Sequence, residues 1–258
     1  MINLHKIKFN LRKNNYIAEI GVNHLGKTNI ANNFVKKLIN TDVEAITFQI
    51  LPPKRMAKLK MDHLPKIFYV KKIDQIKKSK KRVGIAIADE EFINFFDNQK
   101  IDFWKILSVD FYNKNLIKKL IKTNKPIYIS TGISSDREIM NIAKLSSKIK
   151  FIHTTLSHNI IDANLSAITR LRKITGKKIS YGLHCDNRII VYTAIAYNPE
   201  FIFFYVKNSS LKKIPDDKHA INLNEINNFL KNLNDINKSI GNSYKMKNYI
   251  KDPESKIK

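Results

Sequence analysis

Cysteine, acidic residues and long hydrophobic runs are all scarce in this sequence, and each shortage excludes a class of protein. A single cysteine, Cys185, among 258 residues rules out an internal disulfide and a cysteine-rich zinc site, and it suits a reducing, cytoplasmic setting. No segment approaches the roughly 20 consecutive apolar residues of a membrane-spanning helix. The N-terminal segment has no continuous apolar stretch of the kind found in secretory signals. We therefore expect a cytoplasmic protein with no membrane partner.

Acidic residues are outnumbered by basic ones, 22 Asp and Glu against 47 Lys and Arg, which gives a formal charge of +25. Only seven of the basic residues are Arg, and the lysines are dispersed among many Asn and Ile. An A/T-rich coding sequence supplies these residue types, so coding bias explains most of the charge. Nucleic-acid-binding proteins instead gather Arg and aromatic residues into a stripe. The composition argues against nucleic acid as a partner, although the charge would still attract small anions.

Short apolar runs alternate along the chain with segments of helical period. Strands are predicted at 16–21, 44–50, 82–87, 102–107, 126–130, 149–153, 178–183 and 200–206. Helices are predicted near 27–40, 64–77, 89–98, 113–123, 134–146, 160–174, 187–197 and 223–237. This repeat is the pattern of a (β/α)8 TIM barrel, with a doubly wound open sheet as the alternative because periodicity does not show closure. We expect the barrel to span residues 1–240 and a polar, lysine-rich tail to span 241–258.

Polar residues stand at most of the predicted strand ends, whereas the strand interiors are apolar. In a barrel these ends meet at the C-terminal face, where active sites lie. The residues are Glu19, Asn23, Gln49, Lys105, Ser108, Ser130, Thr155, His184 and Tyr205. The pattern therefore predicts a functional site at that face.

Two of these residues leave alternatives open. Lys105 lies inside an apolar strand and must face an anion, either a bound ligand or a buried partner such as Glu19 or Asp110. His184 follows a strand and would be a metal ligand, a general base or a hydrogen-bonded core histidine. The same three alternatives apply to His153 and His158.

The segment AEIGVNHLG at 18–26 resembles the motif that opens the barrel of the sialic acid (N-acetylneuraminate) synthases. Further matches follow in the same order, over about residues 15–240. They are Phe48-Gln49, Lys105-Ile106-Leu107-Ser108, Ser130-Thr131-Gly132-Ile133, His153-Thr154-Thr155, and Pro215-Asp216 ahead of Asn222-Leu223. The sequence is thus identified as a member of that family, which implies a TIM barrel and carbohydrate biosynthesis.

The resemblance also implies a reaction and the residues that perform it. The family condenses phosphoenolpyruvate with N-acetylmannosamine or a related sugar aldehyde, in nonulosonic acid biosynthesis, using Mn²⁺ or Mg²⁺. It implies that Glu19 is the acidic group at the reacting centre and that His184 is a metal-binding histidine. It implies substrate contacts from Asn23, Gln49, Lys105, Ser108, Ser130 and Thr155.

Several positions depart from the family pattern. The family's second metal-binding histidine, at the end of strand 8, is Tyr205 here, and a neutral phenol is a poor ligand for Mn²⁺ or Mg²⁺. The strand-2 lysine is Thr47, and the family's strand-6 asparagine is Leu156. The strand-3 segment reads Ala-Ile-Ala at 86–88, and Gly-Leu at 182–183 replaces a Ser-Asp pair. A metal is therefore in doubt at this site.

These departures leave two functions open. The chain is either a sialic acid synthase-like enzyme, or a catalytically degenerate member that binds a sugar or anionic ligand or partners an active paralogue. Full-length family members carry a C-terminal antifreeze-like domain over the partner subunit's barrel. We expect this chain to lack it, and a homodimer partner or a separate lid protein would then cover the mouth.

Overall fold

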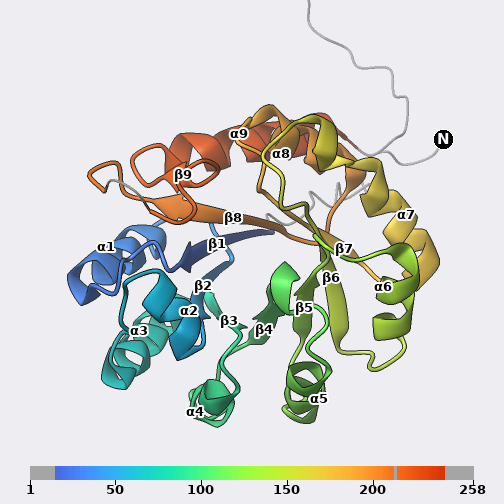
Figure 1. Ribbon diagram of the computed structural model, residues 1–258. Helices are drawn as coiled ribbons and strands as arrows, with labels where there is room; N and C mark the ends of the chain where they lie inside the picture. Colours follow the sequence, from blue (N-terminus) through green and yellow to red (C-terminus); the bar gives the residue numbers. More distant parts are fainter. Residues whose placement is uncertain (1–14, 212–213, 242–258) are drawn as a thin grey trace, which may run out of the picture.

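The computed structural model describes residues 15–211 and 214–241 of the chain. Its eight parallel strands β1 to β8 pair in sequence order, and β8 pairs back with β1, so the sheet closes into a barrel (Figure 1). The strands are β1 (Tyr16–Gly21), β2 (Ala45–Ile50), β3 (Arg82–Ile87), β4 (Phe103–Ile106), β5 (Ile127–Ser130), β6 (Ile149–His153), β7 (Ile179–Gly182) and β8 (Ile202–Lys207). The predicted TIM barrel is confirmed, and the open doubly wound sheet is wrong.

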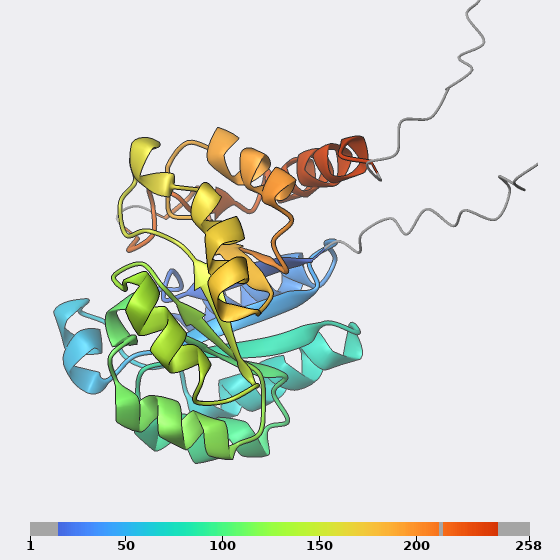
Figure 2. The same ribbon diagram turned by 90° about the vertical axis from the view of Figure 1, so that its right-hand side faces the viewer.

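Helices lie outside the strands, as the view turned by 90° shows for α6 and α7 (Figure 2). The helices are α1 (Thr28–Leu38), α2 (Pro53–Lys58), α3 (Lys66–Lys78), α4 (Ile93–Asn98), α5 (Lys114–Lys122), α6 (Asp136–Ala143), α7 (Ser166–Thr175), α8 (Ile189–Ala194) and α9 (Ile226–Ser239). None of them, in the part of the chain described here, has the length and apolar character needed to cross a membrane.

The structure adds two short elements that periodicity did not predict. Helix α2 has six residues with a proline at its start, which favours helix initiation but is too short to show a period. Strand β9 (Ile221–Asn222) pairs with β8 through Val206 and Lys207. Of the predicted tail at 241–258, only residue 241 lies within the described residues.

Two of the three apolar clusters among the described residues cover the two faces of the barrel strands. Between strands and helices lies the larger cluster, which includes Trp104, whose Nε1 donates a hydrogen bond to Thr123 Oγ1 over 2.8 Å. A smaller cluster fills the barrel interior: Ile17, Ala45, Phe103, Tyr128, Ile152, Phe201 and Phe203. The strands are therefore covered on both faces, which explains why their sequences are almost continuously apolar.

The alternation of side chains along each strand places a polar layer directly above this interior cluster. Ile17, Phe103 and Phe203 point into the barrel, so the residues two positions further on point inward too. Those residues are Glu19, Lys105 and Tyr205, and all three are buried. Strand pairing sets Glu19 opposite Tyr205. The closed register thus gathers charged and hydroxyl groups at the C-terminal mouth.

Candidate functional site at the barrel mouth

Lys105 and Glu19 form a buried ion pair at the centre of the mouth. Lys105 Nζ donates to Glu19 Oε2, and the two side chains are only 4% and 3% exposed. The ammonium also lies 5.3 Å from the ring centroid of Tyr205 and 5.5 Å from that of Phe203. A buried cation needs a partner of opposite charge, and Glu19 is that partner. The aromatic faces of Tyr205 and Phe203 add weaker cation–π contacts.

The alternative partner, Asp110, is engaged elsewhere. Its carboxylate accepts two hydrogen bonds from the guanidinium of Arg55, one of them 2.7 Å long from Nη1. Of the partners left open by the sequence, the structure therefore selects Glu19 for Lys105. Arg55 and Asp110 instead link helix α2, which follows β2, to the turn that follows β4.

Asp216 adds a second carboxyl group beside this ion pair. It lies on the segment between β8 and β9, and its backbone N–H donates to Asn23 Oδ1 over 3.4 Å. Burial and the neighbouring Glu19 raise the pKa of Asp216 from 3.8 to about 7, against the opposing charge of Lys105. A carboxyl with such a pKa exchanges its proton near neutral pH, as a general acid or base requires.

Hydroxyl groups stand on the neighbouring strand ends. Ser108 and Ser130 are 5% and 4% exposed, and Thr155 is half-buried. Ser108 Oγ accepts a hydrogen bond from the backbone N–H of Gly132 over 3.1 Å. A Cβ atom at Gly132 would come within 2.8 Å of that same oxygen, so the glycine is what allows this close approach.

Asn23 and Gln49 are both expected to contact substrate, but their surroundings in the structure differ. Asn23 is fully buried, and its Nδ2 donates to the carbonyl of Val206 over 2.9 Å. Both ends of this amide therefore contact backbone, one on β8 and one at Asp216. Gln49 is half-buried, and its Oε1 accepts a hydrogen bond from the hydroxyl of Tyr205 at 3.3 Å.

Three imidazole rings lie in a row at one side of the mouth. The ring centroid of His219 lies 4.6 Å from that of His184 and 5.3 Å from that of His158. His158 Nδ1 donates to the carbonyl of His184 over 2.7 Å. By contrast, His153 Nε2 donates to the carbonyl of Ala163 over 3.0 Å, so His153 is a hydrogen-bonded core residue.

Burial keeps two of these rings neutral. It lowers the pKa of His184 to about 3, with further lowering by His219, Lys105 and His158. Burial and then His158 lower the pKa of His219 to about 4. Asp216 Oδ1 lies 3.7 Å from His219 Nε2, but a neutral ring makes no ion pair with it at pH 7.

Tyr205, which the resemblance aligns with the family's second metal-binding histidine, lies near His184. Its ring centroid is 6.0 Å from that of His184, so the two side chains do converge. Burial first, then Glu19 and Asp216, raise the pKa of Tyr205, which disfavours the phenolate that a metal would need. Within residues 15–211 and 214–241, no three His, Cys, Asp or Glu side chains are arranged to hold a metal ion.

His219 nevertheless offers unoccupied ring nitrogens. The side chain is buried, and both nitrogens lack a hydrogen-bond partner. Its ring is stacked on that of His184 with the planes 19° apart, so the nitrogen lone pairs of the two rings, which lie in the ring planes, run nearly parallel and do not converge on one ion.

The positions that the resemblance marks as departures carry few polar groups in the structure. Thr47 is buried next to Glu19 in the β1–β2 register. Leu156 is 43% exposed. A Cβ atom at Gly182 would lie 3.0 Å from Ile152 Cγ2, so a larger residue would need its neighbours to move. These positions supply no cation and only one hydroxyl.

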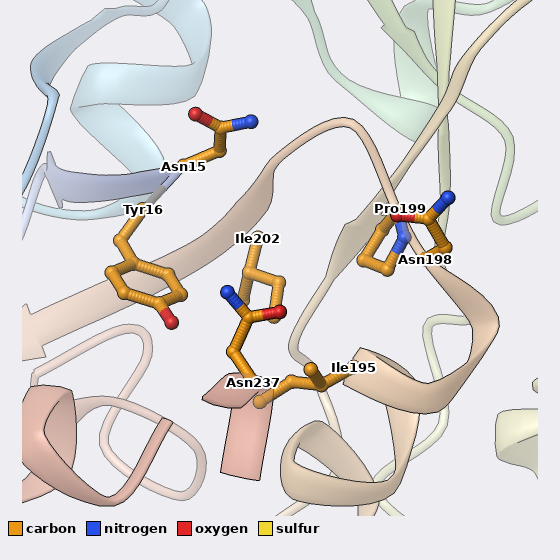
Figure 3. A pocket seen from close by; sticks show the side chains of 7 residues that line it. All are labelled: Asn15, Tyr16, Ile195, Asn198, Pro199, Ile202 and Asn237. Carbon is orange, nitrogen blue, oxygen red and sulfur yellow. The ribbon is translucent and has the colours of Figure 1, made fainter. Parts of the chain in front are cut away.

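Two pockets help to locate the site. One, of about 290 Å³, lies at the opposite end of the barrel, where β1 and β8 begin (Figure 3). It is lined by Asn15, Tyr16, Ile195, Asn198, Pro199, Ile202 and Asn237, none of them an acid or base for chemistry near pH 7. A second hollow of about 450 Å³ is lined by His158, Asp162 and Asp186 among others, beside the histidine row.

The structure gathers most of the residues named from the sequence at this mouth and adds two others, Asp216 and His219. Asp216 belongs to a motif that assigns it no role, and His219 belongs to none of the motifs. Both lie between β8 and β9, in a polar segment without periodicity. Their placement on a loop after a barrel strand was the available signal, because such loops carry the chemistry of these barrels.

Comparison with known proteins gives consistent matches. The model of the NeuB family matches residues 35–245. N,N'-diacetyllegionaminic acid synthase of Campylobacter jejuni is 23% identical over 266 residues, covering 91% of this chain and 80% of that protein. A pseudaminic acid synthase of the same species is 23% identical, covering 81% and 69%. The solved N-acetylneuraminic acid synthetase of Leptospira borgpetersenii superposes with a TM-score of 0.83 at 23% identity, covering 93% and 89%.

Proposed function

The chain belongs to the NeuB family, and from this membership we propose that it condenses phosphoenolpyruvate with an N-acetylmannosamine-like sugar aldehyde in nonulosonic acid biosynthesis. The family match covers most of the chain, and the two curated relatives are named as synthases of nonulosonic acids. We propose the cytoplasm as its location, in keeping with the single free cysteine Cys185.

One observation carries the proposal: a buried cation and two carboxyl groups share the barrel mouth. Lys105, Glu19 and Asp216 are close enough for the pKa of Asp216 to respond to both of the others. A barrel without a function at this face would have no need for three ionisable groups in a desolvated place.

The ion pair would serve to receive an anionic substrate. Phosphoenolpyruvate carries a phosphate and a carboxylate. The ammonium group of Lys105 would donate hydrogen bonds both to Glu19 and to one of these two groups. Ser108 and Ser130 would donate hydrogen bonds to the same anion from neighbouring strand ends. The buried setting strengthens each of these contacts, because few water molecules compete for the donors.

Asp216 would manage the protons of the reaction, next to Glu19, the carboxyl group that the resemblance places at the reacting centre. The new carbon–carbon bond forms as C3 of phosphoenolpyruvate adds to the aldehyde carbon, and the aldehyde oxygen then takes up a proton. Water adds at C2 and loses a proton, and phosphate leaves. With its pKa near 7, Asp216 gives and takes protons at neutral pH, whereas Glu19 holds Lys105 in place.

The resemblance implies a divalent metal ion, which when bound would polarise the aldehyde oxygen. The resemblance gives His184 as its ligand, whereas the ring of His219, stacked nearly parallel on that of His184, is not oriented to bind the same ion. Tyr205 would orient Gln49 through its hydroxyl, and Gln49 would contact the sugar.

A second function is favoured by the depleted polar shell. Thr47, Leu156 and Gly182 stand where the family has a lysine and two polar residues, so fewer donors face the phosphate. A catalytically degenerate barrel would bind a sugar or anionic ligand, or partner an active paralogue, without turnover. Measuring turnover separates the two.

An exposed apolar rim supports the expectation that something covers the mouth. Large apolar side chains are exposed on the loops and helix starts that follow β4 to β7: Val109, Tyr112, Ile133, Leu156, Ile160, Ile161 and Ile189. Ile161 is the most exposed of them, at 92%. A second copy of the chain or a separate lid protein would bury this rim.

Incubating the purified chain with phosphoenolpyruvate, Mn²⁺ and a panel of hexosamine aldehydes tests the proposal. We expect phosphate release that depends on the aldehyde, with a nine-carbon sugar acid detected by mass spectrometry. Asp216→Asn should lower kcat about 100-fold. Its neighbour Asp217→Asn is the matched control, because Asp217 is 55% exposed and pairs with Lys207. Absence of phosphate release with every aldehyde would favour the degenerate member.

A further inference from the structure

The three imidazoles of the mouth do not form a pair of ligands for the divalent metal ion that the resemblance implies. The rings of His219 and His184 are stacked, 4.6 Å between centroids and 19° between planes, so their in-plane lone pairs run nearly parallel. His158 is already bonded through Nδ1 to the carbonyl of His184, over 2.7 Å. Of these three rings, only that of His184 is therefore left for such an ion.

The carboxylates of the mouth do not complete a metal site either. Glu19 Oε2 accepts a hydrogen bond from Lys105 in the buried ion pair. Asp216 is held at Asn23 through its backbone N–H, and its Oδ1 lies 3.7 Å from His219 Nε2. Among the residues that the structure describes, no three His, Cys, Asp or Glu side chains are grouped as a metal site requires. One imidazole alone provides too few ligands to hold a divalent ion in place.

Tyr205 lies beside His184, at the position that the resemblance aligns with the family's second metal-binding histidine. The two rings meet edge to face, with 6.0 Å between centroids and 86° between planes. A neutral phenol is a poor ligand for Mn²⁺ or Mg²⁺, but its O–H donates hydrogen bonds well. A phenol in place of an imidazole therefore removes a metal ligand and adds a hydrogen-bond donor.

The hydroxyl of Tyr205 reaches a side chain that the resemblance assigns to substrate contact. It donates to Gln49 Oε1 over 3.3 Å, which is long for a bond between two oxygens, usually about 2.7–2.8 Å. A substrate oxygen would therefore replace Gln49 as the acceptor at little cost. Tyr205 is buried, so few water molecules compete for its proton and the bond to substrate is strengthened.

The carboxyl group of Asp216 lies next to this phenol. A Cβ atom at Gly21 would come within 2.8 Å of Tyr205 Cε1 and 3.1 Å of Asp216 Oδ2, so both groups flank one point at the end of β1. The absence of a side chain at Gly21 allows this close approach. A hydrogen-bond donor and a carboxyl group thus lie side by side at the mouth.

We propose that this mouth binds no divalent metal ion and that the hydroxyl of Tyr205 polarises the aldehyde oxygen in its place. The role of the hydroxyl rests on the proposed function, whereas the loss of the metal site does not. Both follow from one exchange, of imidazole for phenol, at the end of β8.

The reaction then balances with the groups of this chain alone. As C3 of phosphoenolpyruvate bonds to the aldehyde carbon, the π electrons of the C=O bond move to the oxygen, which accepts the hydrogen bond of Tyr205. Asp216 in its protonated form gives that oxygen a proton and regains one from the water that adds at C2. The bond between C2 and the phosphate oxygen breaks, and phosphate takes the proton of the new C2 hydroxyl as the ketone forms. Tyr205 keeps its own proton throughout.

Mn²⁺ binding tests the loss of the metal site without any turnover. The EDTA-treated full-length chain is titrated with Mn²⁺ at pH 7.5, and the free ion is measured by electron paramagnetic resonance. We expect no bound ion in the wild type and one per chain in Tyr205→His, because an imidazole then lies beside His184. Adding His184→Ala to Tyr205→His should abolish this binding, and circular dichroism verifies that each variant is folded. Stoichiometric binding by the wild type, or none by a folded Tyr205→His chain, would overturn the inference.

Aldehyde-dependent phosphate release tests the role of the hydroxyl. We expect release to continue in EDTA, and Tyr205→Phe to lower kcat about 100-fold with the KM for phosphoenolpyruvate unchanged, since only the donor to the aldehyde oxygen is lost. Tyr192→Phe is the matched control. Its hydroxyl, on helix α8, accepts a hydrogen bond from Asn232 Nδ2 on α9 over 3.4 Å, and its loss should leave kcat unchanged.

The two proposals fail in different ways. Release that stops in EDTA and returns with Mn²⁺, or a Tyr205→Phe chain as active as the wild type, would overturn this inference alone. No release with any aldehyde would overturn the proposed function and with it the role of the hydroxyl. The Mn²⁺ titration then decides by itself whether the metal site is lost.

Discussion

The buried pair of Lys105 and Glu19 makes an asymmetric prediction about stability. Lys105→Met leaves the carboxylate of Glu19 buried and uncompensated, next to Asp216. Removing one partner of a buried ion pair costs about 3–5 kcal/mol. We expect a loss of that size in the free energy of unfolding, because the second carboxyl group adds repulsion that the lysine had offset.

Glu19→Gln should cost less, about 1–3 kcal/mol. Glu19 raises the pKa of Asp216 and Lys105 lowers it, so removing Glu19 favours the ionised form of Asp216 on both counts. Asp216 then becomes the counter-ion of Lys105. The difference between the two single variants measures how far this second carboxylate replaces the first.

Urea unfolding at pH 7, followed by circular dichroism, provides the assay, with the double variant Glu19→Gln/Lys105→Met completing the cycle. The double variant should lose about 1–3 kcal/mol less than the sum of the single losses. The exposed pair of Lys207 and Asp217, 25% and 55% exposed, is the matched control, and its removal should change stability by less than about 1 kcal/mol. Additive losses, or a Glu19→Gln variant as unstable as Lys105→Met, would refute the reasoning.

Three further predictions concern single residues near the mouth. Because burial raises the pKa of Asp216 from 3.8 to about 7, the folded chain holds that proton more tightly than the unfolded chain, and stability should fall as pH rises from about 4 to 7. Asp216→Asn should remove this slope and raise the free energy of unfolding at pH 8 by about 1–4 kcal/mol, measured by urea titration at several pH values; an unchanged slope would contradict it. Gly132→Ala should raise the KM for phosphoenolpyruvate about tenfold in steady-state assays, because its Cβ would come within 2.8 Å of Ser108 Oγ; an unaltered KM would show that Ser108 does not contact this substrate. Gly84→Ala should destabilise the barrel by about 1–3 kcal/mol in thermal unfolding, since its Cβ would lie 2.2 Å from the ring of Phe103, and Phe103→Leu in the same chain should recover part of the loss.

Much of the barrel was readable from local pattern. Each of the eight barrel strands coincides with a predicted apolar run to within two residues, because strands buried on both faces need apolar side chains at every position. Helix ends were less predictable. The predicted helix at 187–197 is α8 followed by a 3-10 turn over Ile195–Tyr197, and the periodicity of side chains does not separate these two.

The chemistry of the mouth was predictable in its residue types and not in its pairings. A lysine inside the apolar run DFWKIL had to face an anion, and the sequence offered Glu19, Asp110 or a ligand. The distance between Lys105 and Glu19 depends on the register of β1 against β8 and on the stagger around the barrel, which no local pattern encodes. The same closure tied Asp110 to Arg55.

By itself the sequence determined the repeat of strand and helix, and with it the face on which polar strand ends would gather, since strands buried on both faces are continuous apolar runs and the helices between them have a period of 3.6 residues. Only the tertiary structure decided which of those polar groups meet. Asp216 and His219 come from a turn without any period, and they join Glu19 and His184 because β9 pairs with β8 and Asn23 bonds to Asp216. Such contacts depend on distances between segments far apart in the chain, and those distances exist only once the barrel has closed.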